Sequence, residues 1–518
     1  MSEKSRTERS IINTGTAVVE LIIYNVLSFI CRTVFIARLG KTYLGFSGLF
    51  SDILTLLSLA EMGFGTAIVF FMYKPAAEKD DRKVAALLGL YRKIYTGLGL
   101  GMTAVGLCLI PLLPYLIRDI PNLPELPLIY VLYLLNTTSS YFFVYKKSLL
   151  IVDQRNDVVS IISIISNLLM NVCQIVGLLL LKSYILYLVV QLLSTVIGNL
   201  MISIYVDRHY PFLKIYKKAG VDRKTRDAIV RNVKALFASK LSSALVTSTD
   251  NLLISKFVST VVLGLYSNYT LFTTMLRTVL TRLFDAITGS VGNLTATEKP
   301  GKIYATFRKV WFVNFWLVGF SCSCIYILIN PFIRIWLGES FLLEGNVTFI
   351  ISLNLYMRLM RNTFLTFTDT YGLFVELKPK CIAEAVINLV VSLFFVLPCH
   401  MGIYGVLLGT FVSNITTNFW YEPYLIYVKK FGVPWLVFLR TFAGYTMTAG
   451  VGIIAVKALA HFTCVFGRVP NFILMMAECL VVINAVYALF YGRTEEMRFF
   501  RETLRRYLTA RGHSEGKN

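Results

Sequence analysis

Val233–Val258 has the sequence VKALFASKLSSALVTSTDNLLISKFV, a mostly apolar run long enough to cross a membrane as a helix. Five polar side chains interrupt it, and at about 100° per residue they fall within an arc of about 100°. Each ionisable group at the bilayer centre costs about 2.5–3.5 kcal/mol on insertion scales, so we expect this face to contact protein or water. The five residues are Lys240, Ser243, Thr247, Asp250 and Asn251.

The flanks of this run repeat an earlier part of the chain. Residues 254–257 followed by 263–264 resemble residues 36–39 followed by 44–45, with one residue inserted in the later copy. Two further similarities occur in the same order, and together they predict that the run begins a second copy of one structural unit. These further pairs are Asp153-x-Arg155 with Glu376-x-Lys378, and Thr195–Asn199 with Thr410–Asn414.

The composition of the chain excludes a soluble enzyme. Of its 518 residues 56% are apolar, 14% aromatic and only 15% charged, and apolar runs of about twenty residues recur. We therefore expect an all-α polytopic membrane protein. The first run, to about Ile36, is too long for a signal peptide and lacks a small-residue cleavage site. Nine cysteines without a CxxC pair and four scattered histidines indicate no metal site, disulfide framework or cofactor.

The apolar runs predict fourteen transmembrane helices, which places both termini on one side of the membrane. With the adjoining span ends included, the segments on that side hold 36 of the 51 lysines and arginines and the opposite segments hold 8. The positive-inside rule then makes both termini cytoplasmic. The predicted spans are 11–36, 43–73, 94–117, 127–150, 158–181, 183–206, 233–257, 260–291, 306–333, 348–372, 381–399, 402–427, 435–458 and 471–491.

Most of the net charge of +22 therefore comes from basic residues in the cytoplasmic segments, which set the orientation of the protein in the membrane. We expect the basic loops to attract anionic lipids of the inner leaflet, and we expect no nucleic-acid partner. The tail from Arg493 to Arg511 has an apolar face among arginines, which predicts an amphipathic helix on the inner leaflet surface.

The repeat and the basic loop predict the domain organisation. Each copy has an even number of spans, so the two copies are related by an axis along the membrane normal. We expect two pseudo-symmetric six-helix lobes around a central cavity, followed by two additional helices. The predicted boundaries are 1–206 for the first lobe, 207–232 for a cytoplasmic linker, 233–428 for the second lobe, 429–491 for the additional helices and 492–518 for the tail.

Polar stripes recur on other predicted spans. Those on spans one, eight and ten each fall within about 60–120° of helix circumference. The cations on spans one, seven, eight and ten would together cost on the order of 10 kcal/mol in lipid, so we expect them to line one water-filled cavity between the lobes. The predicted substrate-binding residues are Arg32, Lys240, Arg277, Arg358, Arg361, Asn25, Ser28, Thr247, Asn251, Thr281 and Asn354.

A structural role is the alternative for any single member of this set. A lone arginine near a span end can extend to the lipid headgroups. This explanation can account for Arg282 and Arg440, and for Arg32 it is an alternative to a place in the cavity. An arginine–aspartate pair across helices can also be purely structural. The set as a whole favours the shared cavity.

Several cations, hydroxyls and amides in one cavity suit an anionic, hydroxyl-rich ligand, because arginine pairs bidentately with phosphate oxygens. A drug-cation exporter needs the opposite charge and more exposed aromatic side chains. No nucleophile–base pair, Walker loop or acid dyad occurs, so we expect no enzyme and no catalytic residue. Embedded acids can bind a coupling proton or sodium ion. The embedded acids are Glu20, Asp52, Glu61, Asp250, Asp285, Asp369 and Glu384, and the ion-coupling candidates that we select from them are Asp52, Glu61, Asp250, Asp285 and Asp369.

Several motifs resemble the polysaccharide transporter (oligosaccharide flippase) family of the multidrug/oligosaccharidyl-lipid/polysaccharide exporter superfamily. The resemblance implies two six-helix lobes that open alternately to each side of a bacterial cell membrane. It also implies a lipid-linked cargo, an undecaprenyl-pyrophosphate oligosaccharide moved to the outer leaflet for a surface glycan. The motifs are Asn13-Thr14-Gly15 through Phe35–Gly40, Tyr43-Leu44-Gly45, Glu61–Gly65, Leu263–Tyr269 and Gly402–Val406.

Three other functions stay open at this point. A lipid II flippase also has fourteen spans. A multidrug or ion antiporter needs neither the two additional spans nor the surplus of intramembrane cations. A membrane glycan polymerase or ligase normally has a large outer loop with catalytic residues, and the predicted outer segments are short.

Overall fold

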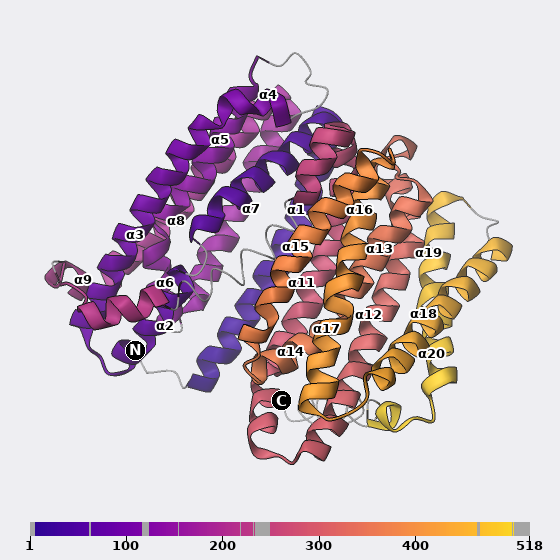
Figure 1. The fold of residues 1–518 in the computed structure, drawn as a ribbon. Coiled ribbons are helices and arrows are strands. Elements are labelled where there is room, and N and C mark those ends of the chain that lie inside the picture. The colour runs from indigo at the N-terminus through magenta and orange to yellow at the C-terminus, as the bar shows by residue number, and fades with distance from the viewer. Residues whose placement is uncertain are drawn as a thin grey trace, which may run out of the picture. The chain divides into compact units, whose positions relative to one another are not determined.

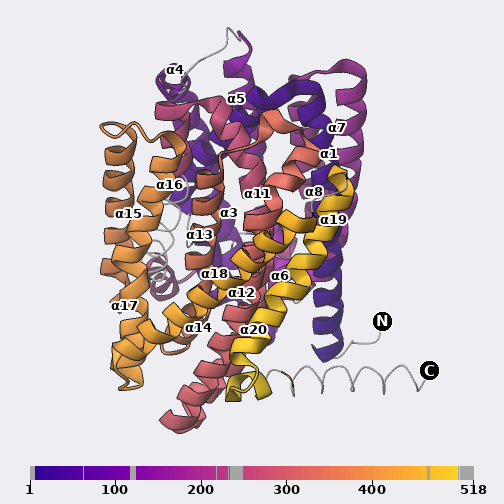
Figure 2. The same ribbon diagram turned by 90° about the vertical axis from the view of Figure 1, so that its right-hand side faces the viewer.

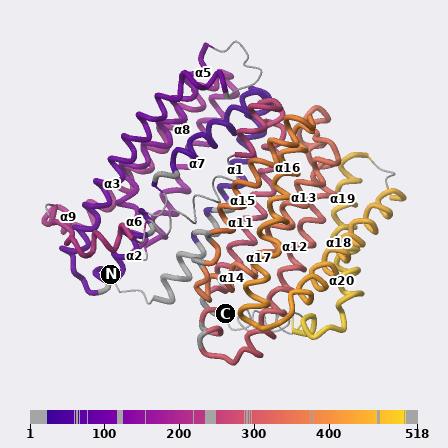
Figure 3. Tube along the Cα trace, viewed as in Figure 1, coloured from indigo at the N-terminus to yellow at the C-terminus, as the bar shows by residue number. Residues whose placement is uncertain are grey.

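The computed structural model describes residues 6–61, 64–116, 124–153, 155–217, 219–231, 233, 249–463, 467–499 and 501. These residues form helices and turns, and no strand occurs among them (Figure 1). Most of the predicted seventh span, with Lys240 and Thr247, lies outside the described residues, as does most of the predicted tail helix. Figure 3 shows the same view as a tube along the Cα trace.

The chain consists of two compact units, Met1–Gly264 (unit 1) and Leu265–Asn518 (unit 2). The division falls inside the helix α11 (Thr260–Thr297). This division separates the chain by how compactly its residues pack. The lobe boundaries predicted from the sequence rest on an internal repeat instead, so they stay a prediction.

Unit 1 is built from helices whose positions follow the apolar runs. α7 and α8 coincide with predicted spans five and six to within three residues at each end. The elements are α1 (Arg6–Leu57), η1 (Ser58–Glu61), α2 (Phe64–Ala77), α3 (Asp81–Cys108), η2 (Ile110–Leu112), α4 (Leu113–Leu116), α5 (Leu126–Ser139), η3 (Ser140–Phe142), α6 (Val144–Val152), α7 (Asn156–Leu181), α8 (Tyr184–His209), α9 (Phe212–Ile215) and η4 (Ile254–Val258).

Two local features explain where the first helices break and begin. Gly40 has φ 81° and ψ −174°, a conformation that glycine adopts without the steric cost of a Cβ, and it kinks α1. This kink lies between the predicted first and second spans. The Asp80 side chain accepts a hydrogen bond from the Lys83 backbone nitrogen at 3.0 Å, and this cap starts α3.

The helices of unit 1 pack around α7, which contacts both α1 and α8, while α5 contacts α3 and α8. Buried hydroxyl groups join three of these helices. The Tyr133 hydroxyl donates to Ser47 Oγ at 2.8 Å and lies 3.0 Å from the Tyr184 hydroxyl. Predicted span four is present as α5 and α6, which meet at an angle of 47°.

Unit 2 contains longer helices and more irregular turns. Predicted span ten is divided between α13 and α14, and predicted span twelve is divided among four short elements. The elements are α11, α12 (Pro300–Trp336), η5 (Glu339–Phe341), α13 (Gly345–Met360), α14 (Asn362–Thr370), α15 (Phe374–Val396), α16 (Gly402–Ser413), η6 (Asn414–Asn418), α17 (Phe419–Pro423), η7 (Tyr424–Lys430), α18 (Trp435–Thr463), α19 (Arg468–Glu478), η8 (Cys479–Ile483) and α20 (Asn484–Tyr491).

The core of unit 2 is aromatic and centres on α12, which contacts α13, α18 and α19. The ring of Phe315 stacks on Tyr445 of α18 with centroids 4.2 Å apart, and it also lies against Tyr487 of α20 at 4.9 Å. Figure 2 shows α18 and α20 beside α12. The two additional C-terminal helices predicted from the sequence are therefore part of the core of this unit.

Eight helices of the described residues are long and apolar enough to cross a membrane, and the bent pair α5–α6 gives a ninth. Spans ten and twelve are divided by helix breaks, so their parts are individually too short to be counted. The predicted fold class, an all-α polytopic membrane protein, is confirmed, and the count of about fourteen spans agrees with the positions of the helices.

Candidate functional site

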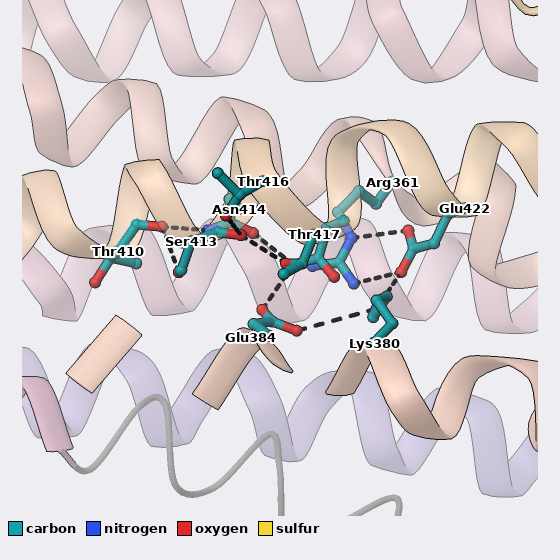
Figure 4. A network of polar contacts seen from close by, with 10 residues as sticks. Arg361, Lys380, Glu384, Thr410, Ser413, Asn414, Thr416, Thr417 and Glu422 are labelled. Carbon is teal, nitrogen blue, oxygen red and sulfur yellow. Dashed lines mark hydrogen bonds and ion pairs between the residues drawn. The ribbon is translucent and has the colours of Figure 1, made fainter. Parts of the chain in front are cut away.

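Four charged side chains meet inside unit 2 and form what we call the ionic cluster: Arg361, Lys380, Glu384 and Glu422 (Figure 4). Arg361 lies between α13 and α14, Lys380 and Glu384 lie on α15, and Glu422 lies on α17. The Glu422 side chain is completely buried, and those of Lys380, Glu384 and Arg361 are 5%, 14% and 19% exposed. The cluster therefore joins three helices below the surface of the unit.

Glu422 is held by both cations of the cluster. Arg361 donates from Nε and Nη2 to the two carboxylate oxygens of Glu422, at 2.9 and 2.6 Å, the planar bidentate geometry that gives strong charge-assisted hydrogen bonds. Lys380 Nζ donates to Glu422 Oε1 at 2.6 Å and lies 4.0 Å from Glu384 Oε2. Two positive and two negative groups make the cluster neutral in its ionised form.

A column of polar side chains continues from the cluster along α16 and η6. Asn418 Nδ2 donates to Glu384 Oε1 at 2.6 Å and to Asn414 Oδ1 at 2.7 Å. Asn414 Nδ2 in turn donates to the backbone oxygen of Thr410 at 3.0 Å. Residues 410, 414, 418 and 422 recur every four positions, so helical geometry places them on one face. The Asn418 Oδ1 atom is buried and has no hydrogen-bond partner among the described residues.

Each helix that contributes a residue to the ionic cluster is irregular close to that residue. Arg361 separates two helices, and Pro379, which cannot donate an intrahelical hydrogen bond, precedes Lys380 inside α15. α17 lies between two π-helical turns, η6 and η7, and π-helical turns inside helices are frequent at functional sites. Pro423 follows Glu422 directly. The charged groups therefore lie next to breaks in the regular helical hydrogen bonding.

A pocket opens beside the cluster against α18. Its walls are mainly methionine and aromatic side chains, with polar groups of the cluster and of η6 at one side. The lining residues are Met357, Met360, Arg361, Phe364, Asn414, Asn418, Phe419, Glu422, Pro423, Phe438 and Phe442.

In unit 1 the structure joins two of the residues singled out from the sequence. Asn251 Nδ2 donates to Asp52 Oδ2 at 2.7 Å. Asn25, Ser28 and Arg32 are half-buried on α1, and Asp250 is buried. The remaining acid, Glu61, lies in η1 beside Tyr141.

In unit 2 the predicted residues have different surroundings. Arg361 belongs to the ionic cluster, and Asn354 Nδ2 donates to the backbone oxygen of Leu407 at 2.8 Å. Arg277 and Thr281 are half-buried on α11, whereas Arg358 on α13 is exposed. The acids Asp285 and Asp369 are also exposed, and each lies within electrostatic range of the other.

Three residues of the cluster do not occur among the predicted site residues. Lys380 lies one position before predicted span eleven, so it is assigned to a loop, whereas α15 begins earlier, at Phe374. Glu384 is an embedded acid that the polar stripes do not include, and Glu422 is an acid alone in an apolar run. The four-residue spacings from Lys380 to Glu384 and from Asn418 to Glu422 are the sequence signal for this site.

The sequence from residue 12 to 287, more than half of the chain, matches the family described as "Polysaccharide biosynthesis protein". Among curated proteins none matches the sequence.

Several solved structures share the fold. A lipid II flippase MurJ in an inward closed conformation has a TM-score of 0.66 at 14% identity and covers 93% of this chain and 99% of its own. An inward-facing multidrug resistance MATE family transporter of the MOP superfamily has a TM-score of 0.65 at 15% identity, with 80% and 99% covered. A MOP superfamily transporter from Pyrococcus furiosus has a TM-score of 0.55 at 12% identity, with 80% and 96% covered. At these identities the similarity establishes the fold.

Proposed function

The chain belongs to the polysaccharide biosynthesis protein family, and from this premise we propose that it is a flippase for a lipid-linked oligosaccharide. Its fold is that of MOP superfamily transporters, and it is a multi-pass membrane protein. The proposed cargo is an undecaprenyl-pyrophosphate-linked oligosaccharide, which moves from the cytoplasmic to the outer leaflet of a bacterial cell membrane. The family match is the observation that supports this cargo most directly, because the family is described by polysaccharide synthesis.

The helices after the repeat also favour a lipid-linked cargo over a drug. The MurJ structure covers 93% of this chain and the MATE structure 80%. The larger share is expected if the flippase, like this chain, has two helices beyond the twelve of the lobes. Here those helices pack against an aromatic core on α12, so they are an integral part of unit 2.

The phosphate-binding groups that we propose are Arg32, Lys240, Arg277 and Arg358. Of these, Arg277 is half-buried and forms no ion pair with any acid of the described residues. Arg361 is different, because Glu422 already occupies its bidentate face, so we assign Arg361 to the ionic cluster rather than to the cargo. Polar side chains that accept and donate to sugar hydroxyls complete the proposed set. They are Asn25, Ser28, Thr247, Asn251, Thr281 and Asn354.

In the mechanism that we propose, the pyrophosphate and sugars enter a cavity between two lobes while the polyprenyl chain stays in lipid. Binding of the anionic head group favours closure of the cytoplasmic side, and the lobes then expose the outer side. Both termini and the basic loops lie in the cytoplasm, next to anionic lipids of the inner leaflet. A coupling ion returns the empty carrier.

Flipping in reconstituted vesicles tests the cargo. The purified protein is placed in vesicles with a fluorescent undecaprenyl-pyrophosphate oligosaccharide, and the fraction of sugar reached by an added glycosidase is followed with time. Arg277→Ala and Arg358→Ala are expected to slow flipping by about tenfold to a hundredfold, because a hydrogen bond to a charged group contributes about 1.5–3 kcal/mol. Arg223→Ala is the matched control, since this arginine is 88% exposed in the basic loop.

Unchanged flipping in Arg277→Ala, Arg358→Ala and Lys240→Ala proteins at equal abundance would contradict the proposed binding groups. The lipid II flippase, the second candidate that the MurJ similarity favours, is separated by complementation. We expect rescue of a strain that lacks a surface-polysaccharide flippase and no rescue of a strain that lacks lipid II flipping. A drug-efflux assay tests the antiporter alternative.

A further inference from the structure

We propose that unit 2 binds ordered water inside its membrane-spanning part, along the contact of α15 with α16, η6 and α17. We call this contact the polar seam. The ligand is water, and the amide groups of asparagine side chains hold it. The inference goes beyond the proposed flipping function and does not depend on the cargo. The seam residues are Lys380, Glu384, Asn388 and Ser392 on α15, and Thr410, Asn414, Asn418 and Glu422 on the facing elements.

The polar seam consists of two rows of side chains that contact each other along their length. Both rows repeat every four residues, so helical geometry brings each row to one side of its helix. At the level of the ionic cluster, Asn418 Nδ2 donates to Glu384 Oε1 at 2.6 Å. Farther along the helices, Asn388 Nδ2 donates to Thr410 Oγ1 at 3.0 Å. Polar groups therefore continue from the ionic cluster to Thr410, inside an apolar span (Figure 4).

Three asparagine side chains at the seam are buried and use only one end of the amide. Asn388 and Asn418 are 0% and 1% exposed, and both donate from Nδ2. Their Oδ1 atoms have no hydrogen-bond partner among the described residues. On α13, which contacts α16, Asn354 Nδ2 donates to the backbone oxygen of Leu407, and its Oδ1 atom is also buried and unpartnered there. Three buried amide oxygens therefore lack a donor from the described part of the chain.

A donor and a hydroxyl group complete the set on α14, which contacts α17. Asn362 Nδ2 and Thr363 Oγ1, directly after Arg361, are buried and have no partner within the described ranges. Buried polar groups nearly always bond to protein or to ordered water, because an unsatisfied group costs free energy. Lipid chains offer neither donor nor acceptor. Water both donates and accepts, so it can satisfy the amide oxygens of the seam and the Asn362 amide alike.

The pocket beside α18 gives this water a place next to the ionic cluster. Asn414 and Asn418 line the pocket together with Arg361 and Glu422, while its other walls are methionine, aromatic and proline side chains. A buried water needs room and about three polar partners. The polar side of the pocket offers both, so we place the first water at Asn418 Oδ1, against that side.

A neutral ligand fits the seam better than an ion. Lys380 Nζ lies 2.6 Å from Glu422 Oε1 and 4.0 Å from Glu384 Oε2, so both carboxylates already have a cation beside them. An added anion would meet the Glu422 carboxylate, to which Arg361 directs its donors at 2.6 and 2.9 Å. Because the ionised cluster is neutral, water completes the hydrogen bonds of the amides without adding a charge.

Hydroxyl-radical labelling of the full-length protein in nanodiscs, without cargo, tests the proposal. A short X-ray pulse converts water into hydroxyl radicals, which oxidise the side chains next to that water, and mass spectrometry measures the rate at each residue. Met360 is the reporter, because it lines the pocket with Asn418 and is only 2% exposed. Met72 of α2, in unit 1, is the control for a deeply buried methionine, at 0%. We expect Met360 to be oxidised about tenfold faster than Met72, because a bound water lies beside it.

Two variants test whether the seam holds this water. Asn418→Leu removes the amide and keeps a side chain of similar length, so the oxidation rate of Met360 is expected to fall to that of Met72. Gln174→Leu is the matched control, because it removes a buried amide of unit 1 that has a partner at each end. Gln174 donates to the backbone oxygen of Tyr187 and accepts from the Cys31 thiol. Its loss is expected to leave the oxidation of Met360 unchanged.

Equal oxidation rates of Met360 and Met72 in the wild-type protein would overturn the water site, and this comparison needs no variant to fold. An Asn418→Leu protein that retained the wild-type rate at Met360 would overturn the assignment of the water to Asn418. The flipping assay is independent of both measurements. If the labelling is as expected and no oligosaccharide is flipped, the proposed function fails and the water site stands.

Discussion

Glu422 is the residue on which the ionic cluster depends, because its carboxylate accepts from both Arg361 and Lys380. Glu422→Gln leaves Arg361 without its carboxylate partner and leaves Lys380 with Glu384 alone, 4.0 Å away. Removal of one partner from a buried ion pair costs about 3–5 kcal/mol, so we expect a large loss of thermal stability in detergent. The triple variant Arg361→Met, Lys380→Met, Glu422→Gln is expected to be more stable than Glu422→Gln alone.

Thermal unfolding followed by the fluorescence of a thiol-reactive dye measures these differences. Glu376→Gln is the control for the loss of an acid without a buried partner, and it is expected to unfold as wild type does. If Glu422→Gln were as stable as wild type, the cluster would not be desolvated, and its assignment as a buried ionic site would be wrong.

At the scale of helices, the close contact between α15 and α16 depends on one missing side chain. A Cβ at Gly409 would lie 2.1 Å from Ser392 Oγ and 2.7 Å from the Ser392 backbone nitrogen. An alanine Cβ would force the backbone of α15 and α16 apart at Ser392. Gly409→Ala is therefore expected to destabilise unit 2 by about 1–3 kcal/mol. Gly101→Ala is the matched control: a Cβ there meets nothing within 4 Å, and alanine is the better helix former. Equal melting temperatures for the two variants would refute the close approach.

The positions of the helices were predictable, whereas the cluster was not. Apolar length fixes a membrane helix locally, so predicted span six, 183–206, corresponds to α8, and the predicted gap after residue 36 contains the Gly40 kink. The cluster joins residues 361, 380, 384 and 422, and only tertiary packing brings these together. Hydropathy also placed Lys380 in a loop, because a lysine ends an apolar run even where the helix continues around it.

At the scale of the whole molecule, the proposed flipping from the cytoplasmic to the outer leaflet requires the predicted orientation in the membrane. The distribution of lysine and arginine predicts that the short segment after α15 faces outward and that the loop 207–232 faces the cytoplasm. Cys399 is exposed just after α15, on the side that this distribution predicts to be the outer one, so its labelling tests the prediction. We expect a membrane-impermeant maleimide to label it in intact right-side-out spheroplasts.

A second cysteine gives the opposite side. Lys224→Cys, in a protein that also carries Cys399→Ser, is expected to be labelled only after the membrane is permeabilised. Cys399→Ser alone reports the background from the other cysteines. Labelling of residue 224 in intact spheroplasts, with Cys399 protected, would mean that the chain has the inverted orientation. The basic loops would then face the outer leaflet instead of the anionic inner leaflet. The cytoplasmic and outer sides of the predicted topology would be exchanged. The proposed direction of flipping, from the cytoplasmic to the outer leaflet, would therefore be contradicted.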